Sequence, residues 1–87
     1  MRIPSVAIRR FWQSCRQLPR DVRKQASAAY RVWHQDAFHP SLHFKKVASD
    51  LWSVRVARSH RALGRFDGDT LVWIWIGGHD DYDLLIR

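Results

Sequence analysis

The spacing of apolar residues changes partway along the chain, from a helical spacing to the spacing of strands. In the first part they recur every three or four positions, which places them on one face of a helix. One such run extends from Val6 to Leu18. Pro19 interrupts it and suits the start of a second helix, because the first helical position does not use its N–H group. We predict the second helix from about Arg20 to His34, antiparallel to the first because the joint is short.

From Leu42 onward the apolar residues alternate with polar ones, which is the pattern of half-buried strands. The predicted strands are a short one through Leu42, Phe44 and Val47, then Trp52–Val56, His60–Phe66 and Leu71–Ile76. The last of these is apolar on both faces, as expected for a central strand. Asp67-Gly68-Asp69 signals a tight turn before it. After Gly77 and Gly78, the residues His79–Ile86 form a short tail with helical character.

These elements predict an α+β fold. Two N-terminal antiparallel helices pack on a small twisted antiparallel sheet of three to four strands, and a short C-terminal tail follows. A chain of 87 residues has the size of one domain with a modest core, so we expect residues 1–87 to form a single domain. Five tryptophans and four phenylalanines supply large side chains for that core.

Cysteine usage and hydropathy bear on the compartment. Cys15 is the only cysteine, which excludes a disulfide scaffold within the chain, and its place in the helical pattern predicts a buried thiol. No segment approaches the roughly 20 apolar residues of a membrane helix. The N-terminus lacks the continuous apolar region of a secretion signal. We therefore expect a cytoplasmic protein.

The charge balance points to an anionic partner. The formal net charge is +7, and arginine supplies most of the positive side chains. The planar guanidinium group fits phosphate oxygens and stacks on bases, so this composition favours nucleic acid. An acidic protein partner, or a basic surface that serves solubility alone, would give the same charge.

Alternation along the predicted strands places basic side chains on one sheet face. A short hairpin would bring Arg55 close to Arg61, and two arginines on one face make a phosphate-sized site. His79 follows two glycines at the end of the last strand, where an imidazole can act as a general acid or base. The simpler interpretation is a solvated basic face with a structural histidine.

A metal site is not expected. His39 and His43 are four residues apart, but Pro40 between them makes a helix improbable and no cysteine completes a ligand set. The sequence contains no glycine-rich phosphate loop either, so we expect neither a metal nor a cofactor.

The order of these elements and motifs resembles the RelE/ParE superfamily of bacterial toxins. The residues that carry the resemblance follow the two helices and are Trp52-Ser-Val-Arg-Val56, His60-Arg-Ala-Leu63 and Trp73-Ile-Trp-Ile-Gly-Gly-His-Asp-Asp-Tyr82. The resemblance implies a RelE-like fold and a toxin of a type II toxin–antitoxin pair, neutralised by a cognate antitoxin. It also implies a ribosome-associated endoribonuclease that cuts mRNA without a metal, through attack of the 2′-hydroxyl on the adjacent phosphate.

The resemblance also implies roles for particular residues. Arg61 matches the arginine that holds the scissile phosphate, Arg55 a basic strand residue, and His79 the proton-transfer group. Tyr82 would stack on a base or orient the phosphate. The further residues expected to contact RNA phosphates are Lys45, Lys46, Arg58 and Arg65.

Two departures from the family pattern keep other functions open. Ser53 stands where some ribonuclease members carry a lysine, and Asp80 and Asp81 place negative charge beside His79, which repels RNA. The alternatives are a ParE-like inhibitor of DNA gyrase that catalyses nothing, and an inactive nucleic-acid-binding relative. A nuclease requires Arg55, Arg61 and His79 on one surface, whereas a gyrase inhibitor does not.

Overall fold

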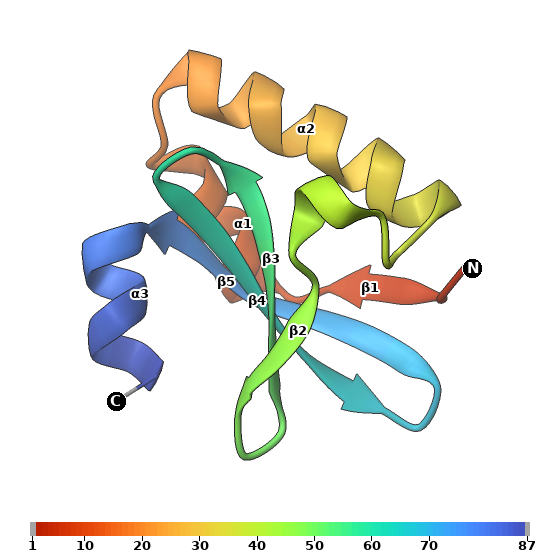
Figure 1. The fold of residues 1–87 in the computed structure, drawn as a ribbon. Coiled ribbons are helices and arrows are strands. Elements are labelled where there is room, and N and C mark those ends of the chain that lie inside the picture. The colour runs from red at the N-terminus through yellow and green to blue at the C-terminus, as the bar shows by residue number, and fades with distance from the viewer. Residues whose placement is uncertain (1, 87) are drawn as a thin grey trace.

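A five-stranded sheet with three α-helices packed against it forms the computed structural model, which describes residues 2–86 (Figure 1). In chain order the elements are β1 (Ser5–Ala7), α1 (Arg9–Arg16), α2 (Arg20–Gln35), the 3₁₀ helix η1 (Pro40–Leu42), β2 (Lys45–Ala48), β3 (Leu51–Ala57), β4 (His60–Asp67), β5 (Thr70–Gly78) and α3 (His79–Ile86). No helix among these residues is long and apolar enough to cross a membrane. The α+β class predicted from the spacing of apolar residues is confirmed.

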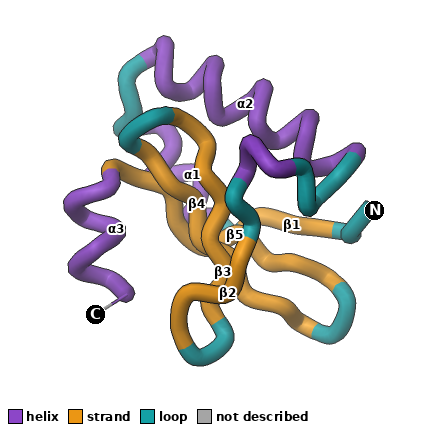
Figure 2. The backbone as a smooth tube through the Cα atoms, viewed as in Figure 1, coloured by secondary structure: helices purple, strands orange, loops and turns teal. Residues whose placement is uncertain are grey.

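The strands lie in the order β1-β5-β4-β3-β2. β2 to β5 follow one another as antiparallel neighbours, joined by tight turns, whereas β1 pairs with β5 in parallel (Figure 2). The β4–β5 hairpin turns at Gly68, whose φ of 62° lies in the left-handed region that glycine adopts without strain. The tight turn predicted at this position is therefore confirmed.

The sheet departs from the prediction at its N-terminal edge. The first helix does not begin at Val6, because Ser5–Ala7 form β1 and α1 starts at Arg9. The peptide N–H of Leu71 donates to the carbonyl of Pro4 at 2.9 Å, at the edge of β5 that β1 covers. The sheet therefore has five strands rather than three to four, and it is mixed rather than purely antiparallel. Three residues are too few for alternation to distinguish a strand from a helix start.

The predicted first strand was also placed too early. Leu42 belongs to η1 and Phe44 precedes β2, which begins at Lys45. Both side chains are nevertheless buried in the core, because the loop that carries them passes under α2. Burial of the two apolar residues was correctly anticipated, but their backbone is not paired in the sheet.

The core lies between the sheet and the helices α1 and α2. α1 packs against β5, and α2 packs against β3. Trp33 of α2 is fully buried, with its ring edge-on to Trp73 at 5.0 Å and to Phe44 at 5.8 Å between centroids. Cys15 is half-buried and packs against this core, so the thiol is less enclosed than predicted. The remaining buried residues of the cluster are Ile3, Ala37, Leu42, Val54, Ala62, Leu71 and Ile76.

We expect the two helix tryptophans to differ sharply in their effect on stability. Trp33→Ala should lower the free energy of unfolding by about 3–5 kcal/mol, because it removes a fully enclosed ring and leaves a cavity. Trp12→Ala, on α1 and 52% exposed, should cost less than about 1 kcal/mol. Urea unfolding followed by circular dichroism measures both, and equal losses would contradict the placement of the core.

Candidate functional site

The strand register aligns two arginines and a glycine across the sheet. Arg55 of β3 lies opposite Arg61 of β4, and Arg61 lies opposite Gly77 of β5. Directly opposite residues share one face of a sheet. Their neighbours Val54 and Ala62 belong to the core, so the row Arg55–Arg61–Gly77 faces away from α1 and α2. We call this side of the sheet the distal face.

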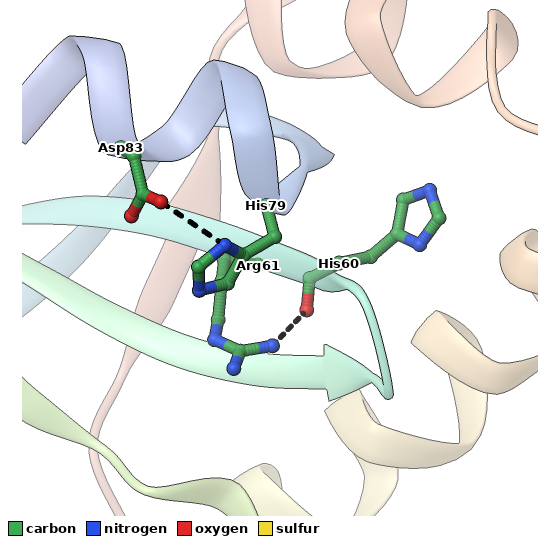
Figure 3. Close-up of polar contacts among 4 residues, drawn as sticks. All are labelled: His60, Arg61, His79 and Asp83. Atoms are coloured by element: carbon green, nitrogen blue, oxygen red, sulfur yellow. Dashed lines mark hydrogen bonds and ion pairs between the residues drawn. The ribbon is translucent and has the colours of Figure 1, made fainter.

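The guanidinium group of Arg61 is held in place by the backbone of the β3–β4 hairpin. Its Nη1 donates to the carbonyl oxygen of His60 at 3.0 Å (Figure 3). The same Nη1 donates to the carbonyl oxygen of Ala57 at 3.3 Å. Among the described residues no carboxylate lies within ion-pair distance of Arg55 or Arg61. The Nε and Nη2 groups of Arg61 therefore keep their donors for a ligand, in the side-on geometry that suits a phosphate.

His79 is the first residue of α3 and stands next to this row. Its peptide N–H donates to the carbonyl of Ser59 at 2.8 Å, which ties the start of α3 to the β3–β4 turn. Arg61 pairs with Gly77, two residues before His79, so the guanidinium and imidazole groups come from neighbouring positions at the same end of the sheet.

An acidic partner orients the imidazole of His79. Its Nδ1 lies 3.2 Å from Oδ2 of Asp83, one helical turn later, and both side chains are nearly half exposed (Figure 3). Among the described residues, Nε2 has no hydrogen-bond partner. Sequence reasoning missed Asp83, although its i, i+4 spacing from His79 on a helix was a readable signal. Asp80 and Asp81, which it did single out, are exposed in the first turn of α3.

The other histidine near the hairpin is not part of the site. The side chain of His60 points away from Arg61 and His79, toward the side of the sheet that the helices cover (Figure 3). Tyr82 is only 6% exposed, and its ring centroid lies 5.7 Å from that of His79. This burial leaves little of the tyrosine ring free to stack on a base. Within residues 2–86, no group of three or more side chains of the types that bind metals gathers at one point.

The remaining predicted phosphate contacts are dispersed. Lys45 lies opposite Ser53 on the distal face, whereas Lys46 lies opposite Trp52 on the helix-covered face. Ser53 is buried and uncharged, and Lys45 opposite it supplies a positive charge at this level of the sheet.

Arg65 and Arg58, the two other arginines predicted to contact phosphate, differ in their surroundings. Arg65 lies four residues from Arg61 along β4, about 13 Å at the rise of a strand. Its Nε binds Oδ2 of Asp50 at 3.0 Å, so a carboxylate already neutralises its charge. Arg58 is exposed in the β3–β4 turn, near Arg55. The structure therefore brings together Arg55, Arg61 and His79, with Arg58 and Lys45 at the margin.

The opposite side of the sheet carries an apolar groove of about 510 Å³ between α1 and α2. Its lining includes Phe11, Trp12, Tyr30 and Trp73, with Arg23 at the rim. Trp12 and Tyr30 are 52% and 46% exposed. Together these side chains give the groove an apolar surface that is open to solvent.

Comparison with known proteins assigns the family. The family model of the ParE-like toxin domain matches residues 20–83, and the chain belongs to this family of the RelE/ParE superfamily. No curated protein matches the sequence significantly.

Solved structures show the same fold. The RelB–RelE antitoxin–toxin complex from Methanococcus jannaschii is similar with a TM-score of 0.73 and 13% identity, over 94% of this chain and 99% of that one. The YoeB/ParE toxin from Agrobacterium tumefaciens has a TM-score of 0.67 and 16% identity, over 88% and 99%. The archaeal RelE–RelB complex from Pyrococcus horikoshii has a TM-score of 0.69 and 9% identity, over 91% and 97%.

The unneutralised pair of arginines should reduce stability. Like charges directly opposite on a sheet repel, so Arg55→Gln should raise the free energy of unfolding by about 0.2–1 kcal/mol in low salt. The gain should shrink in 0.5 M NaCl, because salt screens the repulsion, at a Debye length of about 4 Å. Urea unfolding at the two salt concentrations measures it. Arg65→Gln is the matched control, which should lose rather than gain stability because Asp50 loses its partner.

Proposed function

We propose that this protein is the toxin of a toxin–antitoxin pair and that it cleaves mRNA, in association with the ribosome, so that translation stops. The observation that carries the proposal is the arrangement of Arg55, Arg61 and His79 on one side of the sheet, with no carboxylate bound to either arginine among the described residues. A basic surface that served solubility alone would not require the guanidinium group of Arg61 to be fixed by two carbonyl oxygens.

The proposed reaction is attack of an RNA 2′-hydroxyl on the adjacent phosphorus. The P–O2′ bond forms, the bond to the 5′-oxygen of the next nucleotide breaks, and the products are a 2′,3′-cyclic phosphate and a 5′-hydroxyl. Arg61, aided by Arg55, would bind the phosphate oxygens and stabilise the charge that grows on them in the transition state. The Nε2 atom of His79 would take the proton of the 2′-hydroxyl or deliver one to the leaving 5′-oxygen.

Asp83 would act through His79 as a positioning residue. A carboxylate that accepts from Nδ1–H fixes the tautomer in which Nε2 is available for proton transfer. Because both side chains of the pair are nearly half exposed, the ion pair contributes little to stability. Its role would be to orient the imidazole. Asp83→Asn should therefore reduce the rate of cleavage less than removal of the imidazole.

The proposed antitoxin contact is the groove between α1 and α2. RelE of M. jannaschii and RelE of P. horikoshii, which share this fold, were each solved in complex with RelB. In the present chain α1 and α2 carry seven arginine or lysine side chains and a single aspartate. An acidic segment with apolar side chains on one face matches both the charge and the apolar lining of this groove.

A second candidate function is inhibition of DNA gyrase without catalysis. The match to the ParE-like domain favours it, as do Asp80 and Asp81, whose negative charge beside His79 repels RNA. In that function neither Arg61 nor His79 takes part in a reaction.

Induction of the protein in growing bacteria separates the two functions. Synthesis of DNA, RNA and protein is followed with labelled precursors, and mRNA integrity is read by primer extension. The proposal requires an early stop in protein synthesis with cleaved mRNA. A stop in DNA synthesis with intact mRNA would instead support gyrase inhibition.

We expect Arg61→Gln and His79→Gln to abolish toxicity while the fold is retained. His79→Gln removes the proton-transfer group and should slow mRNA cleavage by about 10²–10⁴-fold. The control is Lys24→Gln, which removes one positive charge from the exposed face of α2 and should leave toxicity intact. Cell growth and primer extension report the outcome. Full cleavage by the His79 variant would refute the assigned role.

We expect Trp12→Ala to weaken binding of the antitoxin about ten-fold or more, because an exposed tryptophan in an apolar groove is a typical energetic centre of an interface. Gln13→Ala is the matched control on the same helix, since Gln13 does not line the groove. Titration with the antitoxin encoded beside the toxin gene, followed by calorimetry, measures both affinities. Equal affinities for the two variants would place the antitoxin elsewhere.

A further inference from the structure

Trp75 occupies an unusual position on the distal face. The register of β4 and β5 pairs Gly64 with Trp73 and Leu63 with Trp75, so Ile74 is an unpaired bulge residue. Without this bulge Trp73 and Trp75, two residues apart, would share a face. With it, Trp73 enters the core and Trp75 turns to the side that carries Arg61.

The indole of Trp75 lies over Gly77. A Cβ on Gly77 would collide with Cζ2 of the ring and lie 2.8 Å from Cη2 and 3.1 Å from Cε2. Gly77 is the residue directly opposite Arg61, and directly opposite side chains are about 5 Å apart. The absence of a side chain at Gly77 thus allows an aromatic ring to lie beside the phosphate-binding arginine. Gly78 differs, because a Cβ there would meet nothing within 4 Å.

Among residues 2–86, the ring of Trp75 has no aromatic neighbour. The other four tryptophans each pack against at least one ring, through Phe11, Trp73, Phe44 or Phe66. Trp75 is half-buried, and within residues 2–86 neither another ring nor a hydrogen-bond acceptor contacts it. The ring lies over the residue opposite Arg61, so part of its surface stays accessible on the sheet face that carries this arginine.

From this geometry we propose that Trp75 is a stacking platform for one base of single-stranded RNA, beside the phosphate held by Arg61. The inference rests on the proposed function and assigns its first base contact. A nucleotide joins its phosphate to its base through one sugar, which matches an arginine and an indole on adjacent strands. Every base has a π-face, so this contact would accept all four bases and provide affinity rather than sequence choice.

A structural explanation competes with this proposal. An aromatic ring over a glycine shields the strand backbone and supports pairing, so Trp75 would then contribute to stability alone. The two explanations differ in whether the ring of Trp75 contacts an RNA base. An RNA strand that lacks one base at a known position distinguishes them, because only a stacked base can be lost.

The test is a double-mutant cycle between the ring and a base. The probe is a 2′-O-methylated single-stranded hexanucleotide, which cannot be cleaved, together with the same strands carrying one abasic position each. Affinities are measured by fluorescence anisotropy for the wild type, Trp75→Leu and Trp75→Phe. The pair Gly77→Ala and Gly78→Ala completes the set, because only the former displaces the ring. Thermal unfolding of each variant shows which proteins are folded at the temperature of the assay.

Trp75→Leu should weaken binding about 5- to 100-fold, as loss of one stacked base does, and Trp75→Phe should restore part of it. With one of the abasic strands, wild type and Trp75→Leu should bind equally. Gly77→Ala should resemble Trp75→Leu, and Gly78→Ala the wild type. Unchanged affinity in folded Trp75→Leu, a loss that persists with every abasic strand, or no binding by the wild type would overturn the proposal. None of these outcomes tests the proposed nuclease activity, which the primer-extension assay of mRNA cleavage measures separately.

Discussion

The pairing of β4 with β5 is the constraint on which both sides of the domain depend. One residue of slip in a strand moves every side chain to the other face. Here the bulge at Ile74 makes that change once, within β5. Before the bulge Trp73 packs into the core against Trp33, and after it Trp75 and Gly77 lie on the distal face beside Arg61. The same hydrogen-bonded ladder thus determines the hydrophobic core and the candidate site.

The charges around the site form a consistent arrangement. Arg65, at the far end of β4, is neutralised by Asp50, and His79 is oriented by Asp83. Arg55 and Arg61 are directly opposite each other without a carboxylate partner among the described residues. Two adjacent positive charges cost stability in the free protein, and a bound phosphate removes that cost. Under the proposed function, the phosphate of the bound RNA would offset this cost.

The domain offers a different chemistry on each side of its sheet. The distal face combines arginines, a histidine and an exposed part of an indole, which are groups that bind a charged and aromatic polymer. The helix-covered side has the apolar groove between α1 and α2 with basic residues around it. Under the proposed function RNA and antitoxin would meet separate surfaces, so neutralisation would require the antitoxin to reach around the sheet or to prevent docking on the ribosome.

Much of the fold was determined by the sequence, because local period and turn chemistry specify α1, α2, β3, β4 and β5 independently of their partners. The sequence also predicted that a short hairpin would bring Arg55 close to Arg61, but the direct pairing depends on a bulge between Arg55 and Ala57. A two-residue turn at Arg58–Ser59 without that bulge would place Arg61 opposite Val56. The tertiary structure alone decided the rest. β1 exists because β5 has an edge to pair with, and the bulge at Ile74 depends on the whole β4–β5 ladder. Such non-local pairing leaves no periodic trace in the chain, so the sequence predicts Trp75 only as an apolar strand residue.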